Sequence, residues 1–215
     1  MQKTVWITGA SSGIGREFAR RYAKMGCRLI LTARRADRLE ALAEELRQAH
    51  GTVCRILTAD LAREEECTRL CKELEGETLD IFINNAGFGV CGSYLETDAA
   101  KEEEMVRVNV EAMARLFRFA VRKMQAAGGG TILNVASSAG LLPGGPYMAG
   151  YYASKAYVAS LTRAWPKSCA RCTARCTSAP SARGRWTPSS TTGRASSLHS
   201  RASRRSSAWT KHCWA

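Results

Sequence analysis

Short runs of β-branched and apolar residues alternate with longer segments of helical periodicity along the first 164 residues of this sequence. The periodicity is clearest where Leu39, Leu42, Ala43 and Leu46 fall at i, i+3, i+4 and i+7, with charged residues between them. Strands that alternate with helices are typical of a parallel sheet, and right-handed crossovers then build a doubly wound α/β fold in one domain. Such a sheet binds ligands at the carboxyl ends of its strands. The predicted strands cover residues 5–8, 28–33, 53–58, 81–84 and 131–135.

The composition fits one soluble domain. A chain of 215 residues, 45% of them hydrophobic, is long enough for one substantial core and short for two. No stretch approaches the roughly 18 uninterrupted apolar residues of a membrane span, and Met1-Gln2 runs directly into a strand-like segment rather than a signal peptide. Nine cysteines, an odd number, then indicate reduced thiols. We therefore expect a cytoplasmic protein without a membrane partner.

The net charge of +13 is unevenly distributed. Residues 166–215 carry two Lys and eight Arg with no Asp or Glu, which is +10 and leaves 13 − 10 = +3 for the remainder. Strongly basic chains often bind nucleic acid. Because the body of this chain is nearly balanced, we expect no specific nucleic-acid partner for it.

A glycine-rich turn follows the first predicted strand. Glycines let a backbone turn tightly and approach a ligand, and free N–H groups at the start of the next helix attract a pyrophosphate. A glycine triplet also occurs in ordinary turns, so the spacing Gly-x-x-x-Gly-x-Gly and the strand-to-helix context carry the interpretation. The segment Thr8–Gly15 predicts a dinucleotide site that includes Gly9, Ser11, Ser12, Gly13, Ile14 and Gly15.

The end of the second predicted strand bears on which dinucleotide binds. Folds that use NAD place an acidic residue about 20 residues beyond the glycine turn, where it accepts hydrogen bonds from the ribose 2′-hydroxyl. This chain has Ala33 there, followed by Arg34 and Arg35. A guanidinium grips phosphate in a bidentate way, so the pattern favours the 2′-phosphate of NADP, with Arg34 as its main ligand. The alternative is that both arginines merely solubilise the start of a helix.

Later motifs point to the same family. Asn84-Asn85-Ala86-Gly87 ends the fourth predicted strand, and Tyr151 and Lys155 have the spacing that puts a phenol and an ammonium on one helical face. With the glycine turn, they make the chain similar to the short-chain dehydrogenase/reductase family, whose fold is Rossmann-like. The match extends to four further positions, Asp60, Leu61, Asn109 and Ser138.

The resemblance implies a reaction and a set of roles. The reaction is hydride transfer between NADP(H) and a small carbonyl or secondary alcohol. Tyr151 acts as general acid or base, and Ser138 polarises the carbonyl oxygen. Lys155 holds the nicotinamide ribose and favours the phenolate, and Asn109 anchors a water of the proton relay. Asp60, Leu61, Asn85, Ala86 and Gly87 border the cofactor, and the family further implies a homo-oligomer. We expect no metal ligands among the site residues.

After Trp165 the character of the sequence changes. Residues 166–215 contain no Val, Ile, Phe or Tyr and are rich in Ser, Arg, Ala and Thr, a composition that is not expected to supply a buried strand. We therefore divide the chain into an incomplete NADP-binding catalytic domain, residues 1–164, and an atypical Ser/Arg-rich tail, residues 165–215. By resemblance, the elements expected after Tyr151's helix, among them a sixth strand and a Pro-Gly motif, are missing from the tail.

Three interpretations of the tail are open. Cys169, Cys172 and Cys176 with Cys213, His199 and His212 could form a zinc site, but their spacing is unfavourable. A basic tail could bind nucleic acid non-specifically. We favour a third, in which the tail is the family's C-terminal segment translated out of frame, so that the chain folds poorly and has little activity.

Two tryptophans support the out-of-frame interpretation, because tryptophan has a single codon. In the other reading frame, the last base of the Trp codon and the first two bases of the next codon form a new codon. Trp165-Pro166 then forces Ala and Trp186-Thr187 forces Asp, and both residues fit a sequence that contains Val-Ser-Ala-Leu-Cys-Pro-Gly-Pro.

Two rival functions also stay open for the whole chain. It could be a non-catalytic dinucleotide-binding protein or an inactive truncated product.

Overall fold

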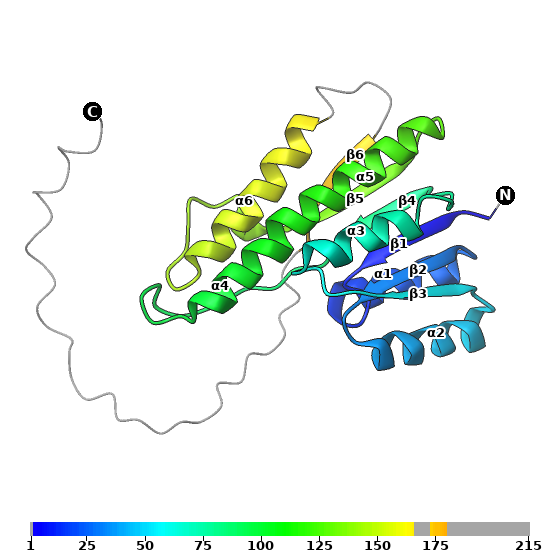
Figure 1. The fold of residues 1–215 in the computed structure, drawn as a ribbon, viewed down its shortest axis with the longest axis horizontal. Coiled ribbons are helices and arrows are strands. Elements are labelled where there is room, and N and C mark those ends of the chain that lie inside the picture. The colour runs from blue at the N-terminus through cyan, green and yellow to red at the C-terminus, as the bar shows by residue number, and fades with distance from the viewer. Residues whose placement is uncertain (1, 166–172, 180–215) are drawn as a thin grey trace, which may run out of the picture. The chain divides into compact units, whose positions relative to one another are not determined.

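The computed structural model describes residues 2–165 and 173–179 of the chain (Figure 1). Within these residues, six parallel strands form one sheet in the order β3-β2-β1-β4-β5-β6. The five predicted strands are all present, with ends shifted by at most two residues, so the doubly wound α/β fold is confirmed. The strands are β1 (Thr4–Thr8), β2 (Arg28–Ala33), β3 (Cys54–Thr58), β4 (Ile81–Asn84), β5 (Thr131–Ser137) and β6 (Thr173–Ala179).

Helices connect the strands. They are α1 (Gly13–Lys24), α2 (Ala36–His50), α3 (Glu64–Glu73), α4 (Ala99–Val106), α5 (Met113–Ala126) and α6 (Ala149–Ala164). A π-helical segment, η1 (Arg107–Ala112), joins α4 to α5, and a 3₁₀ turn, η2 (Ser138–Gly140), follows β5. Helix α2 buries Leu39, Leu42 and Leu46, as its periodicity predicts, and ends at Gly51 in the left-handed conformation.

The structure differs from the sequence-based expectation after Trp165. Residues 173–179 form β6, which pairs in parallel with β5 from Thr131↔Thr173 to Ser137↔Ala179. The expectation considered only apolar side chains. Strand pairing uses backbone N–H and C=O groups, and β6 stands at the end of the strand order, where a strand needs a partner on one side alone. The other predictions for the tail concern residues 166–172 and 180–215, which lie outside the described residues.

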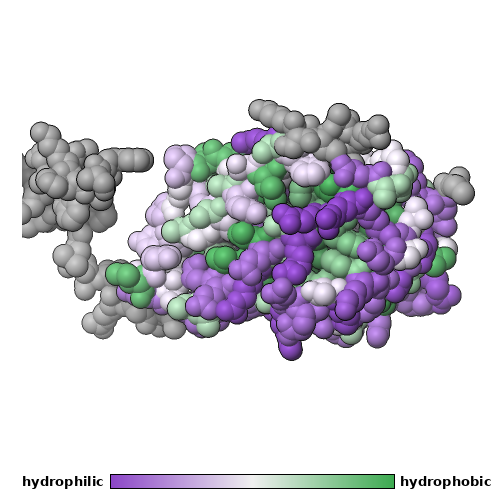
Figure 2. Space-filling view, turned by 45° about the horizontal axis from the view of Figure 1, so that its top comes forward, coloured by the Kyte–Doolittle hydropathy of each residue, from purple (hydrophilic) through white to green (hydrophobic). Residues whose placement is uncertain are grey.

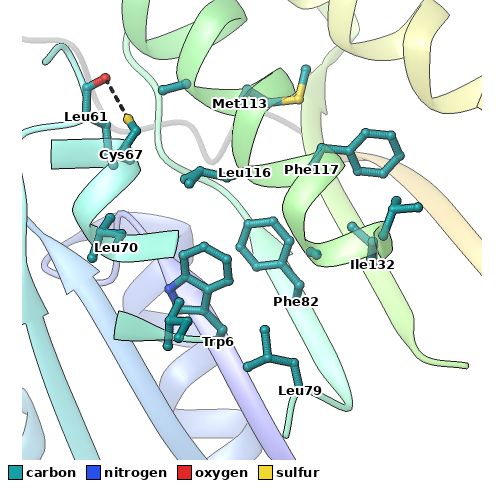
Figure 3. Packing of buried hydrophobic residues seen from close by; sticks show 14 of the residues in the cluster. Trp6, Leu61, Cys67, Leu70, Leu79, Phe82, Met113, Leu116, Phe117 and Ile132 are labelled. Carbon is teal, nitrogen blue, oxygen red and sulfur yellow. Dashed lines mark hydrogen bonds between the residues drawn. The ribbon is translucent and has the colours of Figure 1, made fainter. Parts of the chain in front are cut away.

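Two hydrophobic layers hold the helices on the sheet. On one face, residues of α3, α5 and α6 pack against β1, β4 and β5 (Figure 1), and on the other face α1 and α2 pack against β1 and β2. Trp6 and Phe82, on neighbouring strands, stack with ring centroids 4.2 Å apart. Figure 3 shows these rings side by side, with Leu70 and Leu79 near them. The indole N–H of Trp6 donates to Thr32 Oγ1 at 2.9 Å, so the buried ring has no unsatisfied donor.

The outer faces of the helices are polar. Figure 2 shows a face dominated by hydrophilic residues, with smaller hydrophobic areas between them, as expected where amphipathic helices cover a sheet. Among the described residues, no helix is both long enough and apolar enough to cross a membrane.

Candidate active site

The glycine turn after β1 is fastened to the loop after β4. Thr8 Oγ1 accepts hydrogen bonds from the backbone N–H groups of Asn85 (3.0 Å) and Ala86 (3.1 Å). The side-chain amide of Asn85 donates back to the carbonyl of Thr8 at 2.9 Å. Since β1 and β4 are neighbours at the point where the strand order reverses, these bonds fix the two loops at the usual ligand site of the fold.

Glycine is required in this turn for two reasons. Gly9 has a φ of +67°, in the left-handed region that other residues rarely adopt. At Gly15 a Cβ atom would lie 2.3 Å from the carbonyl oxygen of Gly9 and 2.6 Å from Asn85 Nδ2. The first turn of α1 therefore approaches the loop as closely as backbone atoms allow.

The first turn of α1 is arranged to receive an anion. Ser12, the residue before the helix, makes no side-chain capping bond, and the first turn contains no acidic residue. The leading N–H groups of a helix have no intrahelical acceptors and carry partial positive charge. A phosphate group fits this end of α1.

A cavity of about 780 Å³ opens at the carboxyl ends of the strands. Fourteen of the predicted site residues line it: Gly9, Ser11, Ser12, Gly13, Ile14, Arg34, Arg35, Asp60, Leu61, Asn85, Ala86, Gly87, Tyr151 and Lys155. Gly15, Asn109 and Ser138 are not in its lining. Sequence reasoning missed several apolar or small lining residues, among them Ala33, Ala59, Phe88, Gly89 and Val108. Strand ends and loop turns indicate where a pocket lies, but not which neighbouring small residues reach it.

Another hollow, of about 980 Å³, lies along α3 and α5. Charged side chains such as Arg115, Arg118 and Glu75 line it, and it contains none of the predicted site residues. It lies away from the strand ends at which this fold binds ligands. We therefore place the candidate active site in the smaller cavity.

The two arginines after β2 have different partners. Arg35 donates to the hydroxyl oxygens of Ser11 (3.2 Å) and Ser12 (3.1 Å), so its guanidinium lies over the glycine turn. Arg34 instead forms an ion pair with Glu104 of α4, with 2.7 Å between Nη1 and Oε1. The sequence ranked Arg34 as the main phosphate ligand, whereas Arg35 is the one already grouped with hydroxyl donors.

Asp60 and Leu61 follow β3 at the edge of the cavity. The Asp60 carboxylate accepts a hydrogen bond from the backbone N–H of Ala62 at 3.1 Å, which shapes the turn. Leu61 is buried.

A buried row of amides and a hydroxyl joins β4 to α6. The side-chain amide of Asn84 donates to Asn134 Oδ1 (3.1 Å) and to the carbonyl of Met113 (3.0 Å). Asn134 then donates to Thr162 Oγ1 at 2.9 Å. Buried polar groups that are fully hydrogen-bonded define one arrangement of the elements that carry them. Asn134 and Thr162 were not predicted, because nothing local in the sequence marks their pairing across 28 residues.

Asn109 lies in the π-helical segment and is 1% exposed. Its Oδ1 accepts from the backbone N–H of Phe88 (3.1 Å), and its Nδ2 donates to the carbonyl of Phe88 (2.8 Å) and to Ser154 Oγ (3.0 Å). Ser154 in turn donates to the carbonyl of Tyr151 at 2.8 Å. Asn109 thus ties the loop after β4 to the helix of Tyr151. Sequence reasoning missed Ser154, although its place one residue before Lys155 could have indicated it.

Tyr151 and Lys155 lie on the cavity side of α6. Lys155 is 5% exposed, its Nζ donates to the carbonyl of Val135 at 3.2 Å, and Nζ lies 5.8 Å from the centre of the Tyr151 ring. A Cβ on Gly87 would lie 3.2 Å from this Nζ, so the loop after β4 also approaches it closely. The predicted helical spacing thus brings the phenol and the ammonium to one wall of the cavity.

The two serines after β5 differ in environment. Ser137 Oγ accepts from the N–H of Ala139 at 3.2 Å and so caps the short η2 turn. Ser138 is exposed at the start of that turn.

A family model described as short chain dehydrogenase matches residues 3–179. The chain belongs to the short-chain dehydrogenase family. The match includes the glycine turn, the loop after β4 and the Tyr151 helix, which line the cavity, and it extends to β6.

Curated relatives resemble most of this chain but are longer. Galactitol 2-dehydrogenase (L-tagatose-forming) of Cereibacter sphaeroides is 39% identical over 160 residues, which are 74% of this chain and 62% of that protein. The 17-beta-hydroxysteroid dehydrogenase type 3 of Mus musculus is 29% identical over 160 residues, 74% of this chain and 52% of that protein. The chain therefore spans only half to three fifths of these relatives.

Solved structures of the short-chain dehydrogenase family agree with the fold. A short-chain dehydrogenase from Sphingobium yanoikuyae in complex with NADPH has a TM-score of 0.75 at 34% identity, covering 81% of this chain and 71% of that one. A short chain dehydrogenase/reductase from Burkholderia phymatum in complex with NAD has a TM-score of 0.74 at 31% identity, covering 81% and 65%. Similar structures thus bind one or the other nicotinamide dinucleotide.

Proposed function

We propose that this protein is an NADP(H)-dependent oxidoreductase that interconverts a small carbonyl compound and the corresponding secondary alcohol. The observation that carries the proposal is that Tyr151 and Lys155 line the same cavity as the glycine turn and Arg35. A dinucleotide site and a pair of groups suited to proton transfer then share one cavity. Relatives that act on alcohols and ketones support this assignment.

The cavity fits a dinucleotide phosphate. Gly9 and Gly87 line the cavity, and a Cβ at either position would lie within 3 Å of a neighbouring side chain of the protein, so only glycine fits there. The uncapped start of α1 suits the pyrophosphate, and Arg35 with Ser11 and Ser12 suits a 2′-phosphate. A bound nicotinamide supplies or accepts the hydride.

The protein's own groups handle the proton and the substrate oxygen. Tyr151 donates a proton to the oxygen as a carbonyl is reduced, or accepts it in the reverse direction. Lys155, whose Nζ lies 5.8 Å from the centre of the Tyr151 ring, places an ammonium group beside the phenol and is suited to hold the nicotinamide ribose. Ser138 donates a hydrogen bond to the substrate oxygen, and Asn109 holds the loop that borders both groups.

NADP rather than NAD is the proposed cofactor. Ala33 stands where a carboxylate would bind a 2′-hydroxyl, and two guanidinium groups follow it. A 2′-phosphate satisfies these charges, whereas a hydroxyl leaves them without an anion from the ligand. We extend the proposal to a homo-oligomer, as the family resemblance implies, and to a location in the cytoplasm, as the odd number of cysteines indicates.

Replacement of Tyr151 by Phe tests the proposed function against the rival class, a non-catalytic dinucleotide-binding protein. Removing a general acid should lower kcat/KM for NADPH-dependent ketone reduction by about 100-fold or more, while NADPH binding is retained. Tyr152→Phe is the matched control, since Tyr152 is the next residue of α6 and does not line the cavity. Equal reduction rates in wild type and Tyr151→Phe would rule the mechanism out.

A further inference from the structure

The ion pair between Arg34 and Glu104 joins two elements that flank the cofactor cavity. Arg34 lines the cavity at the end of β2. Glu104 lies on α4, which follows the loop that leaves the carboxyl end of β4 (Figure 1). Val108, one helical turn beyond Glu104, also lines the cavity. Glu104 is therefore not part of the cavity lining, but its carboxylate pairs with the guanidinium of Arg34, which is.

Carboxylate and phosphate compete for the same face of a guanidinium. A phosphate that binds the Nη1–Nη2 pair of Arg34 in a bidentate way needs the Nη1 group, which here donates to Glu104 Oε1, so the two anions compete for Nη1. The side chains of Arg34 and Glu104 are 59% and 33% exposed. Partly exposed ion pairs are weak, so an incoming phosphate group can displace the carboxylate.

Arg35 is in a different situation. Its guanidinium donates to the hydroxyl groups of Ser11 and Ser12 and has no ion pair with a carboxylate among the described residues. A phosphate that reaches this cluster meets three donor groups without displacing an anion. The first contact of a 2′-phosphate is therefore with Arg35, and Arg34 joins only after it leaves Glu104.

We propose that Glu104 is a specificity-determining residue, which holds Arg34 back in the free protein and so weakens binding of a 2′-phosphorylated dinucleotide without affecting the unphosphorylated one. The proposal rests on the proposed use of NADP. An unphosphorylated ribose has no anion to draw Arg34 away, so its binding leaves the ion pair in place. Glu104 thereby reduces the difference in affinity between NADP and NAD.

Equilibrium binding of nucleotides to the full chain tests this without any catalytic readout. The probes are adenosine 2′,5′-bisphosphate and adenosine 5′-monophosphate, which represent the adenosine ends of NADP and NAD, measured by calorimetry at low salt. Glu104→Gln should tighten binding of the bisphosphate by about two- to fivefold, the range set by a partly exposed ion pair. Binding of the monophosphate should stay unchanged.

Glu103→Gln is the matched control. Glu103 is the neighbouring residue of α4, its replacement removes the same charge, and it pairs with Arg107 at 2.9 Å rather than with Arg34. In a chain that also carries Arg34→Gln, the Glu104 substitution should have no effect, because the competition acts through Arg34. Both expectations separate a specific contact from a general change in charge.

The outcomes distinguish a failure of the NADP assignment from a failure of the role proposed for Glu104. If wild type binds the bisphosphate no more tightly than the monophosphate, the NADP assignment fails, and the role of Glu104 fails with it. If wild type prefers the bisphosphate but Glu104→Gln behaves like Glu103→Gln, or weakens binding, the role of Glu104 alone is wrong. Tightening in Glu104→Gln that disappears with Arg34→Gln supports it.

Discussion

At the scale of single residues, the sharpest requirement is for glycine at position 15. A Cβ there would lie 2.3 Å from the carbonyl of Gly9, far inside contact distance, so Gly15→Ala must push α1 away from the turn. We expect a loss of about 1–3 kcal/mol in the free energy of unfolding and at least about tenfold weaker binding of NADPH. Gly76→Ala is the control, since a Cβ at Gly76 would meet nothing within 4 Å and its φ is not in the left-handed region. Chemical denaturation and NADPH titration of both variants check this, and unaltered NADPH binding by Gly15→Ala would contradict the close approach.

At the scale of elements, Glu77 links the start of β2 to β3. It pairs with Arg28 (2.6 Å) and Arg55 (2.5 Å), and its side chain is 16% exposed. The hydrogen bond from Arg28, together with that from Arg55, lowers the pKa of Glu77 in the folded protein. The contribution of Glu77 to stability is therefore fully present above its pKa in the unfolded chain, about 4.3, and is lost as the pH falls through its pKa in the folded protein. Glu77→Gln should therefore destabilise the protein by about 1–2 kcal/mol at pH 7 and by much less at low pH. Urea unfolding at both pH values measures this. Glu44→Gln, at an exposed helical pair, should change little, and an equal effect of Glu77→Gln at both pH values would exclude the ion-pair explanation.

Elements also differ in how far the sequence predicts them. The strands, α2 and the shared face of Tyr151 and Lys155 follow from local periodicity and spacing, and the structure has them where the sequence indicates. The links between elements do not follow from local pattern. Asn109 reaches Ser154 across 45 residues, and Arg34 reaches Glu104 across 70, because the fold brings their elements together. Strand β6 was missed because the prediction weighed side-chain hydrophobicity and not backbone pairing.

At the scale of the whole molecule, the origin of residues 166–215 is the main open prediction. We expect sequencing of the coding DNA around Trp165 to reveal a shifted reading frame. The chain with the restored frame should then melt cooperatively, at a temperature higher by about 5 °C or more than that of the 215-residue chain. The reason is that Leu and Val replace small and charged residues next to β5, and burial of each such side chain stabilises a domain by about 1.5–3 kcal/mol. Calorimetry of the two chains compares them. A confirmed original frame, with a cooperative transition at an ordinary temperature, would refute this account of the tail.

The central claim is that hydride passes between NADP(H) and a carbonyl carbon in the cavity of Tyr151 and Lys155. Its most direct test is to incubate the 215-residue chain with ketones from small to bulky and with NADPH that is deuterated on one or the other side of nicotinamide C4. The products are analysed by mass spectrometry, which detects even a few turnovers. We predict deuterium on the carbinol carbon of an alcohol product from one of the two labelled forms, and its loss with Tyr151→Phe. NADPH binding without deuterium transfer from either form would contradict the claim and leave a non-catalytic dinucleotide-binding protein.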